Sequence, residues 1–142
     1  MKAGELMSRS LVSVGPMESV ASAARLMQRY DLGALPVCDD AGRLRGMLTD
    51  RDITTRCVAA DMDAAETPVR EIMSRGVAWC AAEDELKSAA SVMAERQLRR
   101  LPVMRGGKVV GMLSLGDIAR QERYRMECAS ALGCISNNVR HG

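Results

Sequence analysis

The sequence is poor in aromatic residues and in histidine. Among its 142 residues there is no Phe, and the aromatic side chains are Trp79, Tyr30 and Tyr124. A hydrophobic core must therefore be built from aliphatic residues, with eleven Met residues available to fill irregular gaps. His141 is the single histidine, so the sequence offers neither a Cys-His pair for nucleophilic catalysis nor the paired ligands of a zinc site.

A strong excess of one charge and a long apolar run are also missing. The formal net charge is +2, whereas nucleic-acid-binding proteins usually carry a dense basic stripe. One loose basic cluster is present and reads either as a solvated face or as a weak, salt-sensitive nucleic-acid site; it comprises Arg96, Arg99, Arg100 and Arg105. The longest uncharged run, 128–139, is too short to cross a membrane, and the N-terminus does not resemble a signal peptide. We expect no nucleic-acid partner and no membrane span.

The five cysteines are odd in number and include no Cys-x-x-Cys pair. They are interpreted as reduced thiols of a cytoplasmic protein, although a response to redox conditions stays open. A phosphate-binding loop of the Gly-x-x-x-x-Gly-Lys-Ser/Thr type is absent as well. We therefore predict that the chain is not an enzyme and requires no cofactor or metal.

An internal repeat organises most of the chain. Met7-Ser8-Arg9 recurs as Met73-Ser74-Arg75, and Leu35-Pro36-Val37 recurs as Leu101-Pro102-Val103, both at an offset of about 66. The offset then becomes about 65, because one residue is lost in a turn, and it matches 46–48 with 111–113 and 52–53 with 117–118. A length change in a turn is what a genuine repeat tolerates.

Each repeat has the pattern strand, helix, strand, strand, helix. Helical spacing of apolar residues marks the first helix of each copy, and turn residues separate two strands that follow it. The predicted strands are 11–14, 34–38 and 44–49, then 77–80, 101–104 and 109–114; the closing helices are 51–60 and 115–125. Short helical lead-ins are expected at 4–7 and 69–73. The expected divisions are 1–66, 67–125 and a C-terminal tail, 126–142.

One motif with chemical content occurs at the end of the last strand of each copy. Thr49 is followed three residues later by Asp52, and Ser114 is followed by Asp117. This spacing is that of a helix-capping box, a purely structural role. The same geometry also suits a ligand, because a helix N-terminus and a hydroxyl can hold a phosphate while the carboxylate accepts from ribose hydroxyls. Both interpretations can hold together.

These residues resemble the cystathionine β-synthase (CBS) domain. The resemblance covers about residues 5–122 in two copies, and rests on Leu-Pro-Val followed by Gly-Met-Leu-Thr-Asp-Arg-Asp-Ile. Within the family, 33–38 and 47–53 are most similar to small free-standing bacterial CBS-pair proteins, including the hypoxic-response type. The resemblance implies an α/β (α+β) fold of two β-α-β-β-α repeats packed sheet to sheet with pseudo-two-fold symmetry, usually as a homodimer.

The resemblance also implies an adenine-nucleotide ligand: AMP, ADP, ATP or S-adenosylmethionine. The phosphate and ribose would then contact Thr49, Arg51 and Asp52 in copy one, and Ser114 and Asp117 in copy two. The base would pack near Val14, Ala34, Cys80 and Arg100. Copy two departs from copy one, because Gly116 replaces Arg51, which makes copy one the better candidate for a phosphate unless Arg99 and Arg100 compensate. Trp79 stands where copy one has Ser13, and it can stack on a base, plug the cleft or simply pack.

The favoured function is a regulatory module that binds an adenosine-containing ligand in clefts between the two repeats. It passes a change to a separate effector protein or to its own oligomeric state. The alternative is an interaction or structural module whose clefts are empty or plugged. These hypotheses differ in whether the clefts have room for a ligand.

Overall fold

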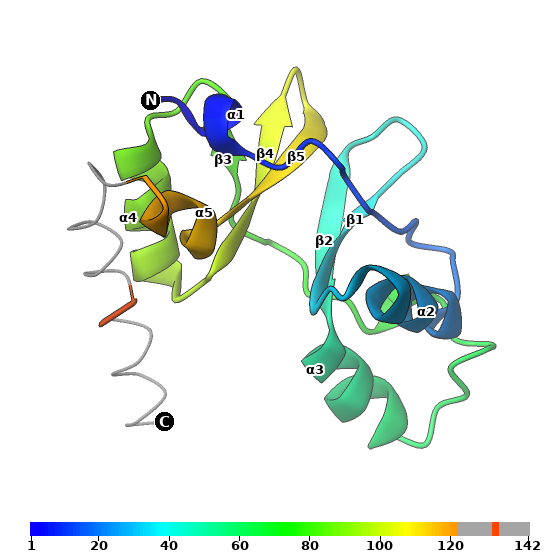
Figure 1. Cartoon of the computed structure of the whole chain (residues 1–142). Helices are drawn as coiled ribbons and strands as arrows, with labels where there is room; N and C mark the ends of the chain where they lie inside the picture. Colours follow the sequence, from blue (N-terminus) through cyan, green and yellow to red (C-terminus); the bar gives the residue numbers. More distant parts are fainter. Residues whose placement is uncertain (122–131, 134–142) are drawn as a thin grey trace. The chain divides into compact units, whose positions relative to one another are not determined.

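The computed structural model describes residues 1–121 and 132–133, which form two compact units. Unit 1 combines Met1–Leu11 with the residues from Ala78 onward, and unit 2 is Val12–Val77 (Figure 1). The chain therefore passes between the units twice, at 11–12 and at 77–78. The segment that opens the first repeat, 1–11, therefore belongs to unit 1, and the segment that opens the second repeat, 69–77, belongs to unit 2. These two segments are called the lead-ins.

Unit 2 is built around an antiparallel pair of strands. β1 and β2 pair from Ala34 with Thr49 to Cys38 with Leu44, and Val14 adds a single parallel bridge to Val37. The elements are α2 (Val20–Tyr30), β1 (Ala34–Cys38), β2 (Leu44–Thr49), α3 (Asp50–Asp52), the π-helical η1 (Ile53–Val58) and the 3₁₀ turn η2 (Val69–Glu71). Ser19 begins α2 because its hydroxyl accepts the Ser22 N–H at 3.1 Å, the usual N-cap contact.

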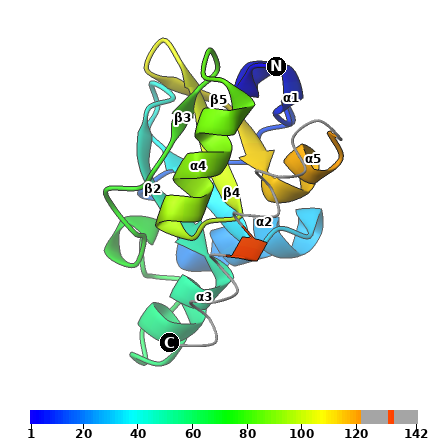
Figure 2. The same ribbon diagram turned by 90° about the vertical axis from the view of Figure 1, so that its left-hand side faces the viewer.

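Unit 1 repeats this plan with a more complete sheet. β3 pairs in parallel with β4, and β4 pairs antiparallel with β5. Figure 2 shows α4 running along this sheet. The elements are α1 (Ala3–Leu6), β3 (Cys80–Ala81), α4 (Leu86–Arg96), β4 (Arg100–Arg105), β5 (Lys108–Ser114) and α5 (Leu115–Ala119).

Each unit buries an aliphatic core of its own. In unit 2, Val20 and Met27 of α2 pack with Leu35 and Leu48 of the strands. In unit 1, Leu86 and Met93 of α4 pack with strand and α5 residues that include Leu101, Leu113 and Ile118. Leucine, valine and methionine thus fill both cores, as the lack of aromatic residues requires.

The lead-ins complete the sheets by backbone pairing. Ser8 and Met112 exchange two N–H···O=C bonds of 2.8 and 3.1 Å, which attach the N-terminal lead-in to β5. Ser74 and Met47 do the same in unit 2, at 2.9 and 3.0 Å. The lead-in of the first repeat is therefore part of unit 1, and that of the second repeat is part of unit 2.

A glycine on each receiving strand makes this pairing sterically possible. A Cβ atom at Gly46 would lie 2.6 Å from the Ser74 carbonyl oxygen and 2.8 Å from the Met73 sulfur. At Gly111 it would lie 2.5 Å from the Ser8 carbonyl oxygen and 2.6 Å from the Met7 sulfur. Real Cβ atoms do not approach that closely, so any other residue would push the lead-in off the strand.

The expected mixed fold of two repeats is confirmed, and the two hairpins lie where the sequence places them. The opening strands were predicted too long: Val14 forms one bridge where 11–14 was expected, and β3 is Cys80–Ala81 where 77–80 was expected. The helix expected at 51–60 is a short α-turn that widens into a π-helix. The helix expected at 115–125 is described as α5, and residues 122–125 and most of the 126–142 tail lie outside the described residues.

We expect Gly46→Ala and Gly111→Ala each to lower the free energy of unfolding by about 1–3 kcal/mol, because each forces overpacking against a backbone carbonyl. Urea unfolding at constant pH measures the change. Gly116→Ala is the matched control, since its Cβ would meet nothing closer than 3.7 Å, and it should leave stability unchanged or raise it. Equal effects of all three substitutions would refute the steric explanation.

Candidate functional site

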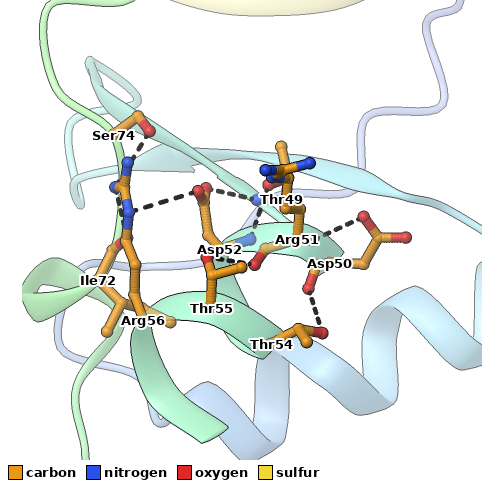
Figure 3. A network of polar contacts seen from close by, with 9 residues as sticks. All are labelled: Thr49, Asp50, Arg51, Asp52, Thr54, Thr55, Arg56, Ile72 and Ser74. Atoms are coloured by element: carbon orange, nitrogen blue, oxygen red, sulfur yellow. Dashed lines mark hydrogen bonds and ion pairs between the residues drawn. The ribbon is translucent and has the colours of Figure 1, made fainter. Parts of the chain in front are cut away.

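The motif at the end of β2 is a complete capping box. The Thr49 hydroxyl accepts the Asp52 N–H at 3.0 Å, and the Asp52 carboxylate accepts the Thr49 N–H at 3.0 Å (Figure 3). Asp52 is 8% exposed, so this carboxylate is set into the surface of unit 2. The structural interpretation of the motif is therefore confirmed in copy one.

Arg56 ties this box to the lead-in of the second repeat. Its Nε lies 3.8 Å from Asp52 Oδ1, and its Nη1 donates to the Ile72 carbonyl at 3.1 Å and to the Ser74 hydroxyl at 3.3 Å (Figure 3). One guanidinium thus links the α3 carboxylate to the segment that pairs with β2. The Thr54 and Thr55 hydroxyls donate to the carbonyls of residues 50 and 51, at 3.1 and 2.8 Å, and so are engaged within the helix.

The same box closes β5 in unit 1. The Ser114 hydroxyl accepts the Asp117 N–H at 3.0 Å, and the Asp117 carboxylate accepts the Ser114 N–H at 3.2 Å. The other oxygen of Asp117 pairs with Arg120, which follows one helical turn later. The cation partner therefore comes from position i+3 in unit 1 and from position i+4 in unit 2.

A surface pocket of about 620 Å³ opens beside the Ser114–Asp117 box. That volume is within the range of small-molecule sites. Its wall combines three arginines with the polar ends of the box; the lining includes Arg99, Arg100, Arg120, Ser114, Gly116 and Asp117. Gly116 stands where copy one has Arg51, so the motif of copy two lacks that cation. Arg99 and Arg100 supply positive charge to the pocket beside the motif. The expectation that copy one is the better phosphate site gains no support from this geometry.

The remaining residues predicted to contact a ligand differ in how far their side chains are exposed. Arg51 is exposed, and Ala34 is partly buried at the start of β1. Val14 and Cys80 are each 2% exposed and belong to the two cores. Their side chains are therefore packing residues, and a ligand near these two positions would meet backbone and neighbouring side chains.

Trp79 is 53% exposed and is not among the residues that line the pocket in unit 1. Plain core packing, one of the three roles considered for it, does not fit that exposure. The ring also does not plug this pocket.

Sequence reasoning missed two cations, Arg56 and Arg120. Both follow the motif carboxylate by one helical turn, and that spacing is the available signal, since basic residues at i+3 or i+4 from an acidic residue share its helix face. The basic cluster considered for nucleic acid is divided by the fold: Arg99 and Arg100 line the pocket, whereas Arg105 lies at the other end of β4.

Cys38, Cys57 and Cys80 are free thiols, and burial raises the pKa of Cys80 to about 11, with a smaller contribution from the charge of Asp84. In the described part of the chain, no group of three His, Cys, Asp or Glu side chains could hold a metal ion. Cys128, Cys134 and His141 lie outside the described residues. Within 1–121 and 132–133, no helix is long and apolar enough to cross a membrane.

Removal of the capping hydroxyl should cost stability. We expect Thr49→Val to lower the free energy of unfolding by about 1 kcal/mol, because the Asp52 N–H loses its acceptor while side-chain volume is kept. Urea unfolding measures this. Thr49→Ser keeps the hydroxyl and should lie within a few tenths of a kcal/mol of the wild type; a Ser variant as unstable as the Val variant would contradict the cap.

The raised pKa of Cys80 predicts slow alkylation. A thiol with a pKa of about 11 stays protonated at pH 8, and the thiolate is the reactive form, so iodoacetamide should modify native Cys80 only above about pH 10. Peptide mass spectrometry after labelling at increasing pH reports this. In urea the same residue should react near pH 8.5, the ordinary range of a free cysteine. Rapid native labelling at pH 8 would refute the buried, protonated thiol.

Comparison with known proteins identifies the family of the chain. The family model of the CBS domain matches residues 3–59 and 69–123. The CBS domain-containing protein YhcV of Bacillus subtilis is 37% identical over 137 residues, covering 96% of both chains. Hypoxic response protein 1 of Mycobacterium tuberculosis is 37% identical over 118 residues, covering 83% of this chain and 82% of the relative.

Solved structures show the same fold. A crystal structure of Hypoxic Response Protein I with two coordinated zinc ions superposes with a TM-score of 0.79 at 37% identity, covering 84% of this chain and 98% of that one. The CBS domain pair of protein MJ0100, in complex with 5-methylthioadenosine and S-adenosyl-L-methionine, gives a TM-score of 0.75 at 23% identity, covering 88% and 98%. Two matched repeats and relatives of this similarity show that the chain belongs to the CBS-domain family, as a CBS pair.

Proposed function

We propose that this CBS pair is a regulatory module that binds an adenine nucleotide or S-adenosylmethionine at the pocket of unit 1. The observation that carries the proposal is the pocket of about 620 Å³ beside the Ser114–Asp117 box, lined by Arg99, Arg100 and Arg120. The adenosine ligands in the MJ0100 CBS pair support the choice of ligand class.

Different residues of the pocket lining suit different groups of a nucleotide. The guanidinium groups of Arg99 and Arg100 suit phosphate oxygens, for which arginine offers paired N–H donors. Asp117 can accept from two neighbouring ribose hydroxyls. Because Asp117 already pairs with Arg120, a ribose would replace that contact and release the arginine toward the phosphate.

A second, pseudo-equivalent site is proposed in copy one. Thr49 and Asp52 form the matching box, and Arg51, which lies between them in the sequence, is exposed. In this proposal the base of a copy-one ligand lies near the backbone at Val14 and Ala34, and the base of a ligand in unit 1 lies near Cys80 and Arg100. Asp52 would have to exchange its contact with Arg56, which also holds the Ile72 carbonyl. Ligand binding there would therefore act on the lead-in paired with β2.

The proposal extends to the setting in which the module acts. We propose a cytoplasmic homodimer without catalytic activity, which acts through a separate effector protein or through its oligomeric state. Three free thiols among the described residues are consistent with a reducing compartment.

A second candidate function is an interaction module that binds no nucleotide. The observation that favours it is that both motif carboxylates are already satisfied, each by a backbone N–H and an arginine. In that case the boxes serve as helix caps and nothing more.

Thermal unfolding with AMP, ADP, ATP and S-adenosylmethionine at millimolar concentration separates the two functions. A ligand that binds the folded state should raise the midpoint temperature as its concentration increases. At one hundred times its Kd, the ligand raises the free energy of unfolding by about 2.7 kcal/mol. The double variant Arg99→Gln, Arg100→Gln should lose at least tenfold in affinity, since two charge-assisted contacts disappear.

Two controls make the result specific. Lys108→Gln removes one exposed positive charge at the other end of β5 and should leave the response unchanged. Arg51→Gln tests the site in copy one. If this variant loses the ligand-induced midpoint shift and the Arg99→Gln, Arg100→Gln variant keeps it, the ligand binds in copy one. No midpoint shift with any of the four ligands would favour the interaction module.

A further inference from the structure

A second basic pocket lies in unit 2, away from the Thr49–Asp52 box. It has a volume of about 490 Å³ and is lined by three arginines and four apolar residues: Arg45, Arg70, Arg75, Pro16, Met17, Leu44 and Met73. Leu44 is the first residue of β2 and Thr49 the last, so the pocket lies at the hairpin end of the strand and the box at the opposite end. It is thus a different site from the one described above.

Within the described ranges, none of the three arginines of this pocket forms an ion pair within 4.0 Å. The charge of Arg45 acts on Asp39 from farther away and adds to the lowering of the pKa of that carboxyl, which the Arg43 N–H causes first. The nearby carboxylate of Asp39 is held by the backbone N–H groups of Ala41 and Arg43, at 3.0 and 2.9 Å. Arg75 donates to the Arg70 carbonyl at 3.4 Å, which brings these two residues together. Three like charges around one pocket repel one another, and an anion would relieve that repulsion.

The equivalent place in unit 1 shows that the fold does not require an arginine at positions 45 and 70. The backbone contacts are the same: Arg70 N–H donates to the Pro16 carbonyl at 2.9 Å, and Gly4 N–H donates to the Ala82 carbonyl at 2.9 Å. By the repeat offsets, Arg45 corresponds to Val110 and Arg70 corresponds to Gly4. Two of the three pocket arginines of unit 2 are therefore replaced by uncharged residues in unit 1. Arg75 keeps its counterpart Arg9, and the Arg105 guanidinium of unit 1 would lie 3.2 Å from a Cβ atom at Gly4.

The acidic content of the two places also differs. Met17 of unit 2 corresponds to Glu83 of unit 1, whose carboxylate pairs with Lys2 at 3.0 Å. Unit 1 thus has a carboxylate at this place, whereas no carboxylate lines the pocket of unit 2. An anion would therefore meet less negative charge in unit 2 than at the equivalent place in unit 1.

We propose that Arg45, Arg70 and Arg75 form a second anion site that binds the phosphate or pyrophosphate group of a small molecule. Arginine presents paired donors that match phosphate oxygens, and three of them balance a di- or trianion. The apolar wall from Pro16, Met17 and Leu44 takes the organic part that carries the phosphate. Because Arg70 and Met73 belong to the lead-in of the second repeat and Arg45 to β2, the anion joins the two segments that pair within unit 2.

Titration of the full chain with inorganic pyrophosphate, followed by two-dimensional ¹⁵N–¹H NMR, tests this site directly. Saturable shifts are expected at the amides of Arg45, Arg70, Met73 and Arg75, beyond those caused by sodium chloride at equal ionic strength. The shifts should persist in the Arg99→Gln, Arg100→Gln variant, so failure of the nucleotide site and failure of this site are distinguishable.

Matched variants decide whether the geometry or the bulk charge matters. The triple variant Arg45→Gln, Arg70→Gln, Arg75→Gln should weaken pyrophosphate binding by at least tenfold. The control triple variant Arg25→Gln, Arg29→Gln, Arg96→Gln removes the same charge from α2 and α4, outside the pocket lining, and should not weaken binding. Arg45→Val alone, which copies the residue that unit 1 carries in the same frame, keeps the proposal testable if the triple variant unfolds, and should weaken binding about tenfold. Absence of saturable shifts at these amides, or equal loss in both triple variants, would overturn the proposal.

Discussion

Each unit depends on one close contact, in which the carbonyl of a lead-in serine crosses a glycine on the receiving strand. A Cβ atom at Gly46 or Gly111 would lie 2.6 or 2.5 Å from that oxygen, so the contact needs a residue without a side chain. The adjacent Met73 or Met7 then fills the space beside the strand. Because each lead-in opens the other repeat in sequence, each unit contains a segment of both repeats.

The capping box connects that architecture to the proposed ligand sites. Asp52 and Asp117 stabilise the first helical turn and at the same time present an oxygen to a nearby arginine. In unit 2, the arginine is Arg56, which also holds the Ile72 carbonyl and the Ser74 hydroxyl of the lead-in. A ligand that competes for the carboxylate would therefore change the same contacts that keep the lead-in on its strand. This is a physical route by which binding could favour one state of the pair over another.

Much of this could be predicted from the sequence, for identifiable reasons. The repeat, the two hairpins and the boxes follow from local patterns: apolar periodicity, turn residues, and a hydroxyl three residues before Asp. The exchange of lead-ins could not be read this way, because Ser8 pairs with Met112 across more than one hundred residues. Arg99 and Arg100 lie at the start of β4 and Arg120 follows α5, and only the fold brings these arginines to one pocket. The π-helical widening after Asp52 likewise has no signal in apolar spacing.

Deletion of residues 1–10, followed by peptide-resolved hydrogen exchange, tests the exchange of lead-ins most directly. These residues open the first repeat in sequence, yet the structure assigns them to unit 1. The account predicts that the deletion accelerates amide exchange across 78–121, above all in β5, and leaves 12–77 close to the intact chain. Accelerated exchange in 12–77 with an unchanged 78–121 would show that the lead-in stabilises its own repeat, and would contradict the account.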